Sequence, residues 1–250
     1  MAFLRTSEEE SRRFERRVAR AAIASDADPS WVDGVLAEAV SSTFDLVIVR
    51  YPSSHVQAFE RFSAQPGCKA IFADTLLYFA WDDHGEDLPF AHEIAERDEI
   101  DAETISGLIE TIFTGYTNHY HANSALNAEY IAAGYAEWAQ AVAADSQNPL
   151  VVLRVGGIDA AIAVVDRSSG QWDIVLAGVM PSFRGRGVYR ELVTATMSAA
   201  RQDRQATVKI STQSHNVQVI RTWEKLGWRM TAAYLTAHLE LEQPRPGRRP

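Results

Sequence analysis

The chain has 250 residues, of which 46% are hydrophobic and 23% are charged, and its formal net charge is −9. This length is enough for one large core or two small ones, and the acidic balance argues against a nucleic-acid partner, which would need a basic binding face. The single cysteine, Cys68, excludes an intramolecular disulfide and a zinc site built from cysteines.

The N-terminal sequence carries no recognisable export or membrane signal. Residues 1–6 lack the apolar core of a signal peptide, and no apolar run approaches the roughly 18 residues that a helix needs to cross a bilayer. We therefore expect a cytoplasmic protein with no membrane partner.

The first part of the chain is predicted to form a charged extension and a small α/β subdomain. Residues 5–24 are rich in arginine and glutamate, which favours a solvated helix within an extension over residues 1–28. Asp28-Pro29 then offers a helix N-cap followed by proline at the first helical position. The acidic stretch 82–99 is predicted to be a linker, so the subdomain with its linker spans residues 29–98. The elements expected in it are a helix over 29–40, a strand over 44–51, a helix over 56–62 and a strand over 69–81.

A larger domain is predicted over residues 99–242, followed by a disordered tail rich in proline and arginine over residues 243–250. Apolar residues at helical spacing after Asp101 predict its first helix. Two turns that contain glycine separate three strands, which indicates antiparallel hairpins. The expected elements are helices from 101 and over 127–143, 187–201 and 216–226, strands over 150–155, 160–166, 172–180 and 208–212, and one or two strands over 228–241.

A glycine-rich turn, Arg184-Gly185-Arg186-Gly187, joins the strand over 172–180 to the helix that follows. The free N–H groups and the dipole of a helix N-terminus attract anions, and glycine lets the backbone approach a phosphate closely. Arginine side chains can add charge-assisted hydrogen bonds. The turn therefore predicts a phosphate site, with a plain turn carrying surface arginines as the alternative. The P-loop and dinucleotide-binding glycine motifs are both absent from the sequence.

Two separated segments resemble the signature of the GNAT superfamily of N-acetyltransferases. Arg184-x-x-Gly187 after a strand is similar to its Q/R-x-x-G-x-G/A turn, and Asn216 followed by Lys225-Leu226-Gly227-Trp228 is similar to its N…Y-x-K-x-G-F segment. The resemblance covers roughly residues 99–241. It implies an α/β GNAT fold, in which helices flank a mixed, mostly antiparallel central sheet, and it implies acetyl-CoA or another acyl-CoA as co-substrate.

The resemblance also implies which residues hold the coenzyme. Backbone groups near Gly178, Val179 and Met180 would pair with the pantetheine arm, and Asn216 would contact the coenzyme from the end of the neighbouring strand. The pyrophosphate would lie on the turn, whose residues are Arg184, Gly185, Arg186, Gly187, Val188 and Tyr189.

Further segments resemble a narrower group, the N-acetyltransferases that acylate the 4-amino group of a TDP-linked deoxysugar of the fucosamine type. This similarity implies that the N-terminal unit is a truncated, GNAT-like α/β subdomain without a coenzyme site, and that the acceptor is a small molecule, a nucleotide-linked amino sugar. The segments that carry it are 44–50, 74–79, 119–123, 135–138 and 211–216.

The loop over residues 116–123 holds the densest cluster of hydrogen-bonding side chains in the chain. By the GNAT resemblance, the loop between the first two helices closes over the acceptor, whereas structural capping is the alternative reading of its residues. His119 and His121 resemble half of a metal site, but no third ligand lies nearby in sequence, and we expect no metal. The candidates for binding the acceptor are Tyr116, His119, Tyr120, His121 and Asn123, and His119 and Tyr120 are also candidate catalytic groups.

The sequence departs from the family pattern at two positions. Tyr189 stands where the turn carries a second Gly or Ala, and Trp223 stands where many members carry a tyrosine that is proposed to protonate the departing thiolate. An indole N–H can donate a hydrogen bond but cannot act as an acid near neutral pH. Trp223 is therefore expected either to pack only, or to stabilise the thiolate while the ammonium product or Tyr120 supplies the proton.

Two kinds of function follow from these features. The first is an N-acyltransferase in which a primary amine attacks the thioester directly. The second is a coenzyme-binding protein with lost or altered chemistry, acting as a sensor or partner subunit. An acyl donor bound to a carrier protein, and a homodimeric assembly, are also left open by the sequence.

Overall fold

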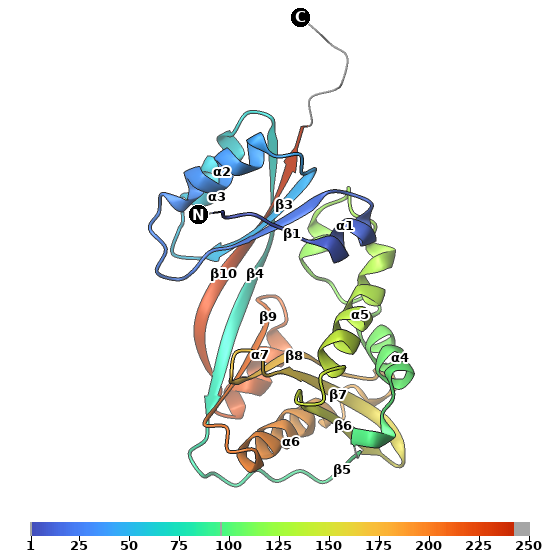
Figure 1. Ribbon diagram of the computed structural model, residues 1–250. Coiled ribbons are helices and arrows are strands. Elements are labelled where there is room, and N and C mark those ends of the chain that lie inside the picture. Colours follow the sequence, from blue (N-terminus) through green and yellow to red (C-terminus); the bar gives the residue numbers. More distant parts are fainter. Residues whose placement is uncertain (1, 96, 243–250) are drawn as a thin grey trace, which may run out of the picture. The chain divides into compact units, whose positions relative to one another are not determined.

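The computed structural model describes residues 2–95 and 97–242, and its contacts divide the chain into two compact units (Figure 1). Within the described residues, the first unit comprises residues 2–76, 117–130 and 232–242, and the second comprises residues 77–95, 97–116 and 131–231. These units do not follow the predicted division at residues 28 and 98, because both take in segments that are far apart in the sequence. The predicted tail over 243–250 lies outside the described residues.

The first unit is a sheet with two helices on one face. Strand β1 pairs antiparallel with β2, β2 pairs parallel with β3, and β3 pairs antiparallel with β10. The elements are β1 (Arg5–Thr6), α1 (Glu8–Phe14), β2 (Val18–Ala22), α2 (Trp31–Ser41), β3 (Leu46–Pro52), α3 (Ala58–Ala64), and parts of β4 (Cys68–Asp82) and β10 (Arg229–Leu241).

The core of this unit lies between the sheet and helices α2 and α3. Trp31, Tyr51 and Phe62 are each at most 3% exposed, and their ring centroids lie 5.5–5.9 Å apart. The helices and strands predicted for residues 29–81 are confirmed here, with ends that differ by a few residues.

The N-terminal segment is not the solvated helix that was predicted over residues 5–24. It forms β1, the seven-residue helix α1 and β2. Arg16 and Arg17, which lie directly before β2, form ion pairs with Glu240 and Asp45 respectively. Val18, which follows these arginines, is fully buried opposite Leu46 of β3. The prediction was wrong because the acids that neutralise the segment come from distant parts of the chain.

The second unit is a mixed sheet with helices on both faces. Strands β5 to β8 pair antiparallel in chain order, and β8 pairs parallel with β9. The elements are β5 (Glu93–Ile94), α4 (Ala102–Phe113), α5 (Ile131–Ala143), β6 (Leu150–Val155), β7 (Ile158–Asp166), β8 (Trp172–Val179), α6 (Val188–Gln202), β9 (Thr207–Gln213), α7 (Val217–Lys225), the remaining parts of β4 and β10, and short 3-10 helices at Arg97–Glu99 and Pro181–Phe183.

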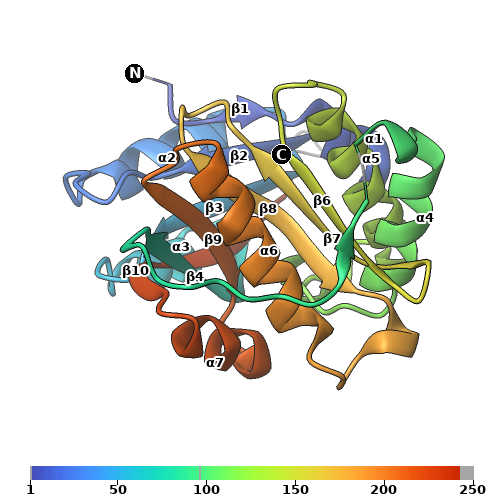
Figure 2. The same ribbon diagram turned by 90° about the horizontal axis from the view of Figure 1, so that it is seen from below.

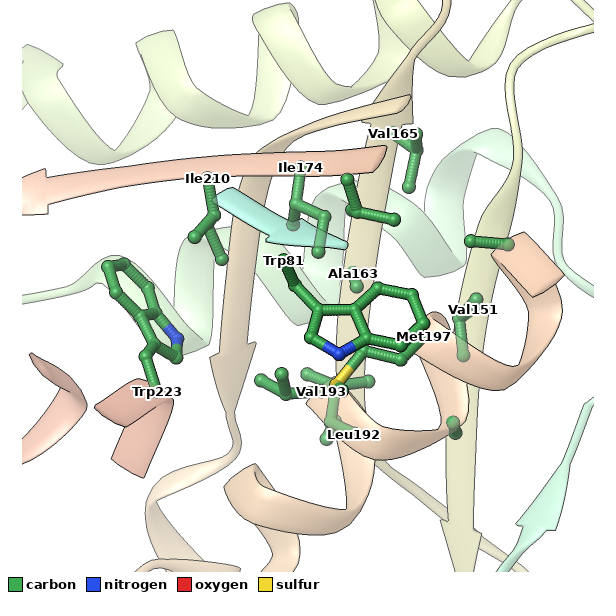
Figure 3. Close-up of a cluster of buried hydrophobic side chains, with 14 of the residues drawn as sticks. Trp81, Val151, Ala163, Val165, Ile174, Leu192, Val193, Met197, Ile210 and Trp223 are labelled. Atoms are coloured by element: carbon green, nitrogen blue, oxygen red, sulfur yellow. The ribbon is translucent and has the colours of Figure 1, made fainter. Parts of the chain in front are cut away.

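Successive side chains along each strand of this unit face opposite sides of the sheet, so the unit has two hydrophobic cores. Val152 and Ile162 face α4 and α5, whereas Leu153 and Ala163 face the opposite side, where α6 crosses the sheet (Figure 2). The second of these cores, shown in Figure 3, joins α6 to Trp223 of α7. The predicted α/β class with a mixed, mostly antiparallel sheet flanked by helices is confirmed. No described helix is both long enough and apolar enough to span a lipid bilayer.

Candidate functional site

Strands β8 and β9 separate before they end. They pair in parallel only at Trp172–Val208, Asp173–Lys209 and Ile174–Ile210, although β8 continues to Val179 and β9 to Gln213. On its other edge, β8 keeps its pairing with β7 up to Val179. Backbone N–H and C=O groups need hydrogen-bond partners, so the free edge of β8 after Ile174 can pair with an extended ligand that enters the notch between the two strands.

The glycine-rich turn follows this notch directly and leads into α6. Gly185 and Gly187 have φ values of 76° and 82°, in the left-handed region that favours glycine. Gly187 is the N-cap of α6, and no side chain caps the helix there. Because the turn is exposed, the first N–H groups of α6 remain available to an anion. The guanidinium of Arg186 lies 5.8 Å from the Phe183 ring, at the same turn.

Arg184 uses its side chain to hold the turn in place. Its guanidinium donates to the carbonyl oxygen of Val179 at 3.2 Å and to that of Ile112 at 2.8 Å. These bonds tie the turn to the end of β8 and to helix α4. The guanidinium of Arg184 is therefore directed towards backbone carbonyls, and Arg186 and the backbone of the turn remain the candidates for contact with a phosphate.

Gly178 allows α4 to lie close to β8. A Cβ atom at this position would lie 2.3 Å from Cγ2 of Ile112, which is far inside van der Waals contact. We expect Gly178→Val to lower the free energy of unfolding by about 2 kcal/mol or more, since overpacking a core typically costs 1–3 kcal/mol. Urea unfolding measures this change, and Gly107→Val, at a helical glycine with open space around its Cβ position, is the control for adding the side chain. Equal stability of the two variants would contradict the close packing of α4 on β8.

The two departures from the family pattern meet in space. The indole N–H of Trp223 donates to the hydroxyl oxygen of Tyr189 at 3.1 Å. Trp223 is 1% exposed and lies against the rings of Phe79 and Trp228, at centroid distances of 5.2 and 6.3 Å. Burial raises the pKa of the Tyr189 phenol. The indole N–H is thus already hydrogen-bonded to Tyr189. A hydrogen bond from Trp223 to a thiolate would require this contact to break.

Asn216 lies where the notch opens on the side of β9. It precedes α7, and its side-chain amide donates to the hydroxyl of Thr212 at 3.1 Å. The phenol of Tyr116 donates to the side-chain carbonyl of Gln213, the last residue of β9. The sequence assigned no role to Gln213, although this residue lies within the segment 211–216 on which the resemblance drew.

The other candidates for binding the acceptor lie in the first unit. His119 and Tyr120 begin a 3-10 helix, His119–Ala122, and both are buried. His119 shares a 2.9 Å hydrogen bond with His238 of β10, and Asn123 donates to Glu240 at 2.5 Å. His121 completes a capping box with Asn118. These contacts correspond to the capping alternative, and contact with an acceptor stays a prediction for His119, Tyr120, His121 and Asn123.

Tyr120 forms part of a partly buried ionic group, in which Glu10 and the phenol are buried and the side chain of Arg20 is 41% exposed. Its hydroxyl donates to Glu10 at 2.5 Å and accepts from Arg20 at 2.9 Å, and Arg20 also pairs with Glu10 at 2.6 Å. Burial raises the pKa of Tyr120 to about 12, so the phenol is protonated at neutral pH with its proton held by Glu10. Within the described residues, no group of three or more His, Cys, Asp or Glu side chains is placed to hold a metal ion.

Acidification should destabilise the folded protein through the pair of buried histidines. Burial lowers the pKa of His238 to about 4 and that of His119 well below its usual value, whereas both titrate near 6.5 in an unfolded chain. Below pH 6.5 the unfolded chain binds more protons, so the free energy of unfolding falls as the pH falls. From pH 7 to pH 5 we expect a loss of about 2 kcal/mol from His238 alone.

Urea unfolding at the two pH values measures this loss. A His238→Gln variant should lose about half of the pH dependence of stability between pH 5 and pH 7, because His119 stays buried and still contributes. If that variant kept the full dependence, the buried histidine would not be its source.

The family model that describes the acetyltransferase (GNAT) family matches residues 80–228. This span is more than half of the chain, and it contains the notch, the glycine-rich turn and Trp223. No curated protein was found to be significantly similar in sequence.

Solved structures share the fold. A GCN5-related N-acetyltransferase from Sphaerobacter thermophilus is 16% identical, with a TM-score of 0.56, and the match covers 80% of this chain but only 60% of that one. A GCN5-related N-acetyltransferase from Kribbella flavida is 14% identical, with a TM-score of 0.55 and coverage of 92% and 83%. An acetyltransferase of the GNAT family from Colwellia psychrerythraea is 12% identical, with a TM-score of 0.52 and coverage of 85% and 72%. Such identities show the fold alone, but together with the extent of the family match they complete the assignment: the chain belongs to the acetyltransferase (GNAT) family.

Proposed function

We propose that the protein transfers an acetyl group, or another short acyl group, from acyl-CoA to a primary amine. The observation that carries the proposal is the notch beside β8, which ends directly at the exposed, uncapped turn before α6. An extended pantetheine arm has amide groups that can pair with the free edge of β8. The pyrophosphate then reaches the N-terminus of α6, where N–H groups and the helix dipole favour an anion.

The chemistry proposed is direct attack of a neutral amine on the thioester carbonyl. A backbone N–H near Val179 polarises the carbonyl oxygen, and coenzyme A leaves as the amide forms. The protein then contributes mainly by holding the two reactants in contact and in the correct orientation. In this mechanism no acyl group is attached to the protein.

We propose a nucleotide-linked amino sugar as the acceptor. This proposal rests on the resemblance of the segments 44–50, 74–79, 119–123, 135–138 and 211–216 to the amino-sugar N-acetyltransferases. The test is release of coenzyme A thiol from acetyl-CoA in the presence of a panel of TDP-amino sugars and other primary amines. Thiol release that depends on a TDP-amino sugar supports the substrate class, and release only with other amines would replace that acceptor while keeping the reaction.

A coenzyme-binding protein without transfer activity is the second candidate, and Trp223 favours it, because an indole stands where a phenol is expected. Acetyl-CoA binding in calorimetry without thiol release with any amine would support this function. A cytoplasmic location and a homodimeric assembly are further proposals, which cell fractionation and light scattering would test.

A further inference from the structure

The hydrogen bond between Tyr189 and Trp223 connects the two helices that follow β8 and β9. Tyr189 is the second residue of α6 and lies two positions after Gly187, so its side chain starts from the turn that binds the anion. Trp223 lies in the last turn of α7. The contact therefore joins a residue that directly follows the glycine-rich turn, Tyr189, to a residue of the helix after β9, Trp223.

Trp223 is held rigidly, and it determines where the phenol lies. Its indole is buried in the core cluster with Ile210 and Leu192 (Figure 3), and the ring of Phe79 meets it nearly edge-on. Tyr189 packs against this same cluster, which includes Ile210, where the pairing of β8 with β9 stops, and Val179, where β8 ends. The Tyr189 phenol interacts electrostatically with that of Tyr116, which bonds Gln213 at the end of β9. The phenol therefore lies on the β9 side of the notch, and the bond at its oxygen restricts the rotation of its hydroxyl.

The hydroxyl proton of Tyr189 has a different environment from those of Tyr116 and Tyr120. The indole N–H occupies one acceptor position of the oxygen, and no described residue accepts the hydroxyl proton. By contrast, Tyr116 donates to Gln213 and Tyr120 donates to Glu10. Because burial raises its pKa, Tyr189 is protonated at neutral pH and has a hydrogen-bond donor that is not used within the protein.

We propose that the Tyr189 hydroxyl donates its proton to the sulfur of coenzyme A as the thioester breaks, and that Trp223 is the residue that positions it. The inference rests on the proposed acyl transfer. The amine nitrogen forms a bond to the carbonyl carbon, the carbon–sulfur bond breaks, and sulfur takes its electron pair. The phenol proton passes to sulfur, and the phenolate takes a proton from the nitrogen, which leaves an amide, a free thiol and a restored phenol.

The test compares Tyr189→Phe with the wild-type protein using two donors. With acetyl-CoA and an amine that the protein acylates, kcat should fall by about a hundredfold, which is typical for the loss of an acid catalyst, while the Kd for coenzyme A changes by less than about twofold. A selenol is more acidic than a thiol and leaves without protonation. With the selenium analogue of acetyl-CoA, the fall in kcat should therefore shrink to about tenfold or less.

Two further variants complete the design. Trp223→Phe keeps the ring packing and removes only the positioning hydrogen bond, so kcat should stay within about tenfold of wild type. Tyr51→Phe is the matched control, since this buried phenol of the first unit has no hydrogen-bond partner among the described residues and its loss should leave kcat unchanged.

The outcomes separate the two proposals. A Tyr189→Phe variant with wild-type kcat, or with the same loss for the sulfur and selenium donors, would overturn the role of Tyr189 and leave acyl transfer intact. Wild-type protein that binds acetyl-CoA but acylates no amine would overturn the proposed function, and the role of Tyr189 with it.

Discussion

Gly187→Glu should weaken acetyl-CoA binding by well over tenfold, which corresponds to more than about 1.4 kcal/mol. Gly187 is the N-cap of α6, and a glutamate there places a carboxylate among the N–H groups that are proposed to bind the pyrophosphate. The negative charge opposes the anion directly and also competes for the same donors. Isothermal titration calorimetry of the folded variant measures the change.

A matched control separates charge from backbone strain in this experiment. Gly170 has a φ of 78°, close to the 82° of Gly187, but it lies in the exposed turn before β8 and not in the turn after it. Gly170→Glu therefore introduces the same side chain and a similar strain at the other end of the strand. We expect it to bind acetyl-CoA like the wild type, and equal affinities in all three proteins would remove the coenzyme site from this turn.

Glu10→Ala should lower the free energy of unfolding by about 2–3 kcal/mol. Glu10 is 3% exposed, and it accepts hydrogen bonds from Arg20 and from the phenol of Tyr120. Its removal leaves the buried phenol of Tyr120 without its acceptor, and it leaves Arg20, whose side chain is 41% exposed, without its ion-pair partner. The loss is costly mainly because the buried phenol stays desolvated without compensation. Urea unfolding at neutral pH measures the difference.

Glu9→Ala is the comparison for this variant, because Glu9 precedes Glu10 in the same helix α1 and is exposed. Its loss should change the free energy of unfolding by less than about 0.5 kcal/mol, as is usual at surface positions. If the two variants were equally stable, the group around Glu10 would contribute nothing to folding.

The strand, turn and helix of the proposed coenzyme site could be predicted because their determinants are local. A run of apolar residues, two glycines and a helical repeat lie within residues 172–201 and need no distant partner to be recognised. The orientation of the side chains could not be predicted in the same way. The guanidinium of Arg184 is engaged within the protein, because it donates to the carbonyl of Ile112, 72 residues earlier in the chain.

The burial of two polar segments also could not be predicted from the local sequence. The N-terminal arginines and the loop over 116–123 both have the composition of exposed surface, yet parts of both are buried. Their partners Glu240 and His238 come from β10, more than a hundred residues away. Charge patterns in a single stretch of sequence do not reveal whether the opposite charge will arrive from another strand.

The contact between Tyr189 and Trp223 was also hidden, because the two residues lie 34 positions apart on different helices. Taken singly, each is an exception to the family pattern. Taken together, they form a donor and acceptor pair between α6 and α7, so that one contact accounts for both exceptions. A sequence pattern that scores positions independently has no means of finding such a pair.

The most direct test of the proposed acyl transfer follows the acyl group itself. The protein is incubated with acetyl-CoA labelled with ¹³C in the acetyl group and with a panel of TDP-amino sugars and simple amines, and the products are identified by mass spectrometry. The proposed function predicts a labelled N-acetyl product from at least one amine, formed repeatedly by each protein molecule and lost in Gly187→Glu. Tight binding of acetyl-CoA with no labelled amide from any amine would contradict it.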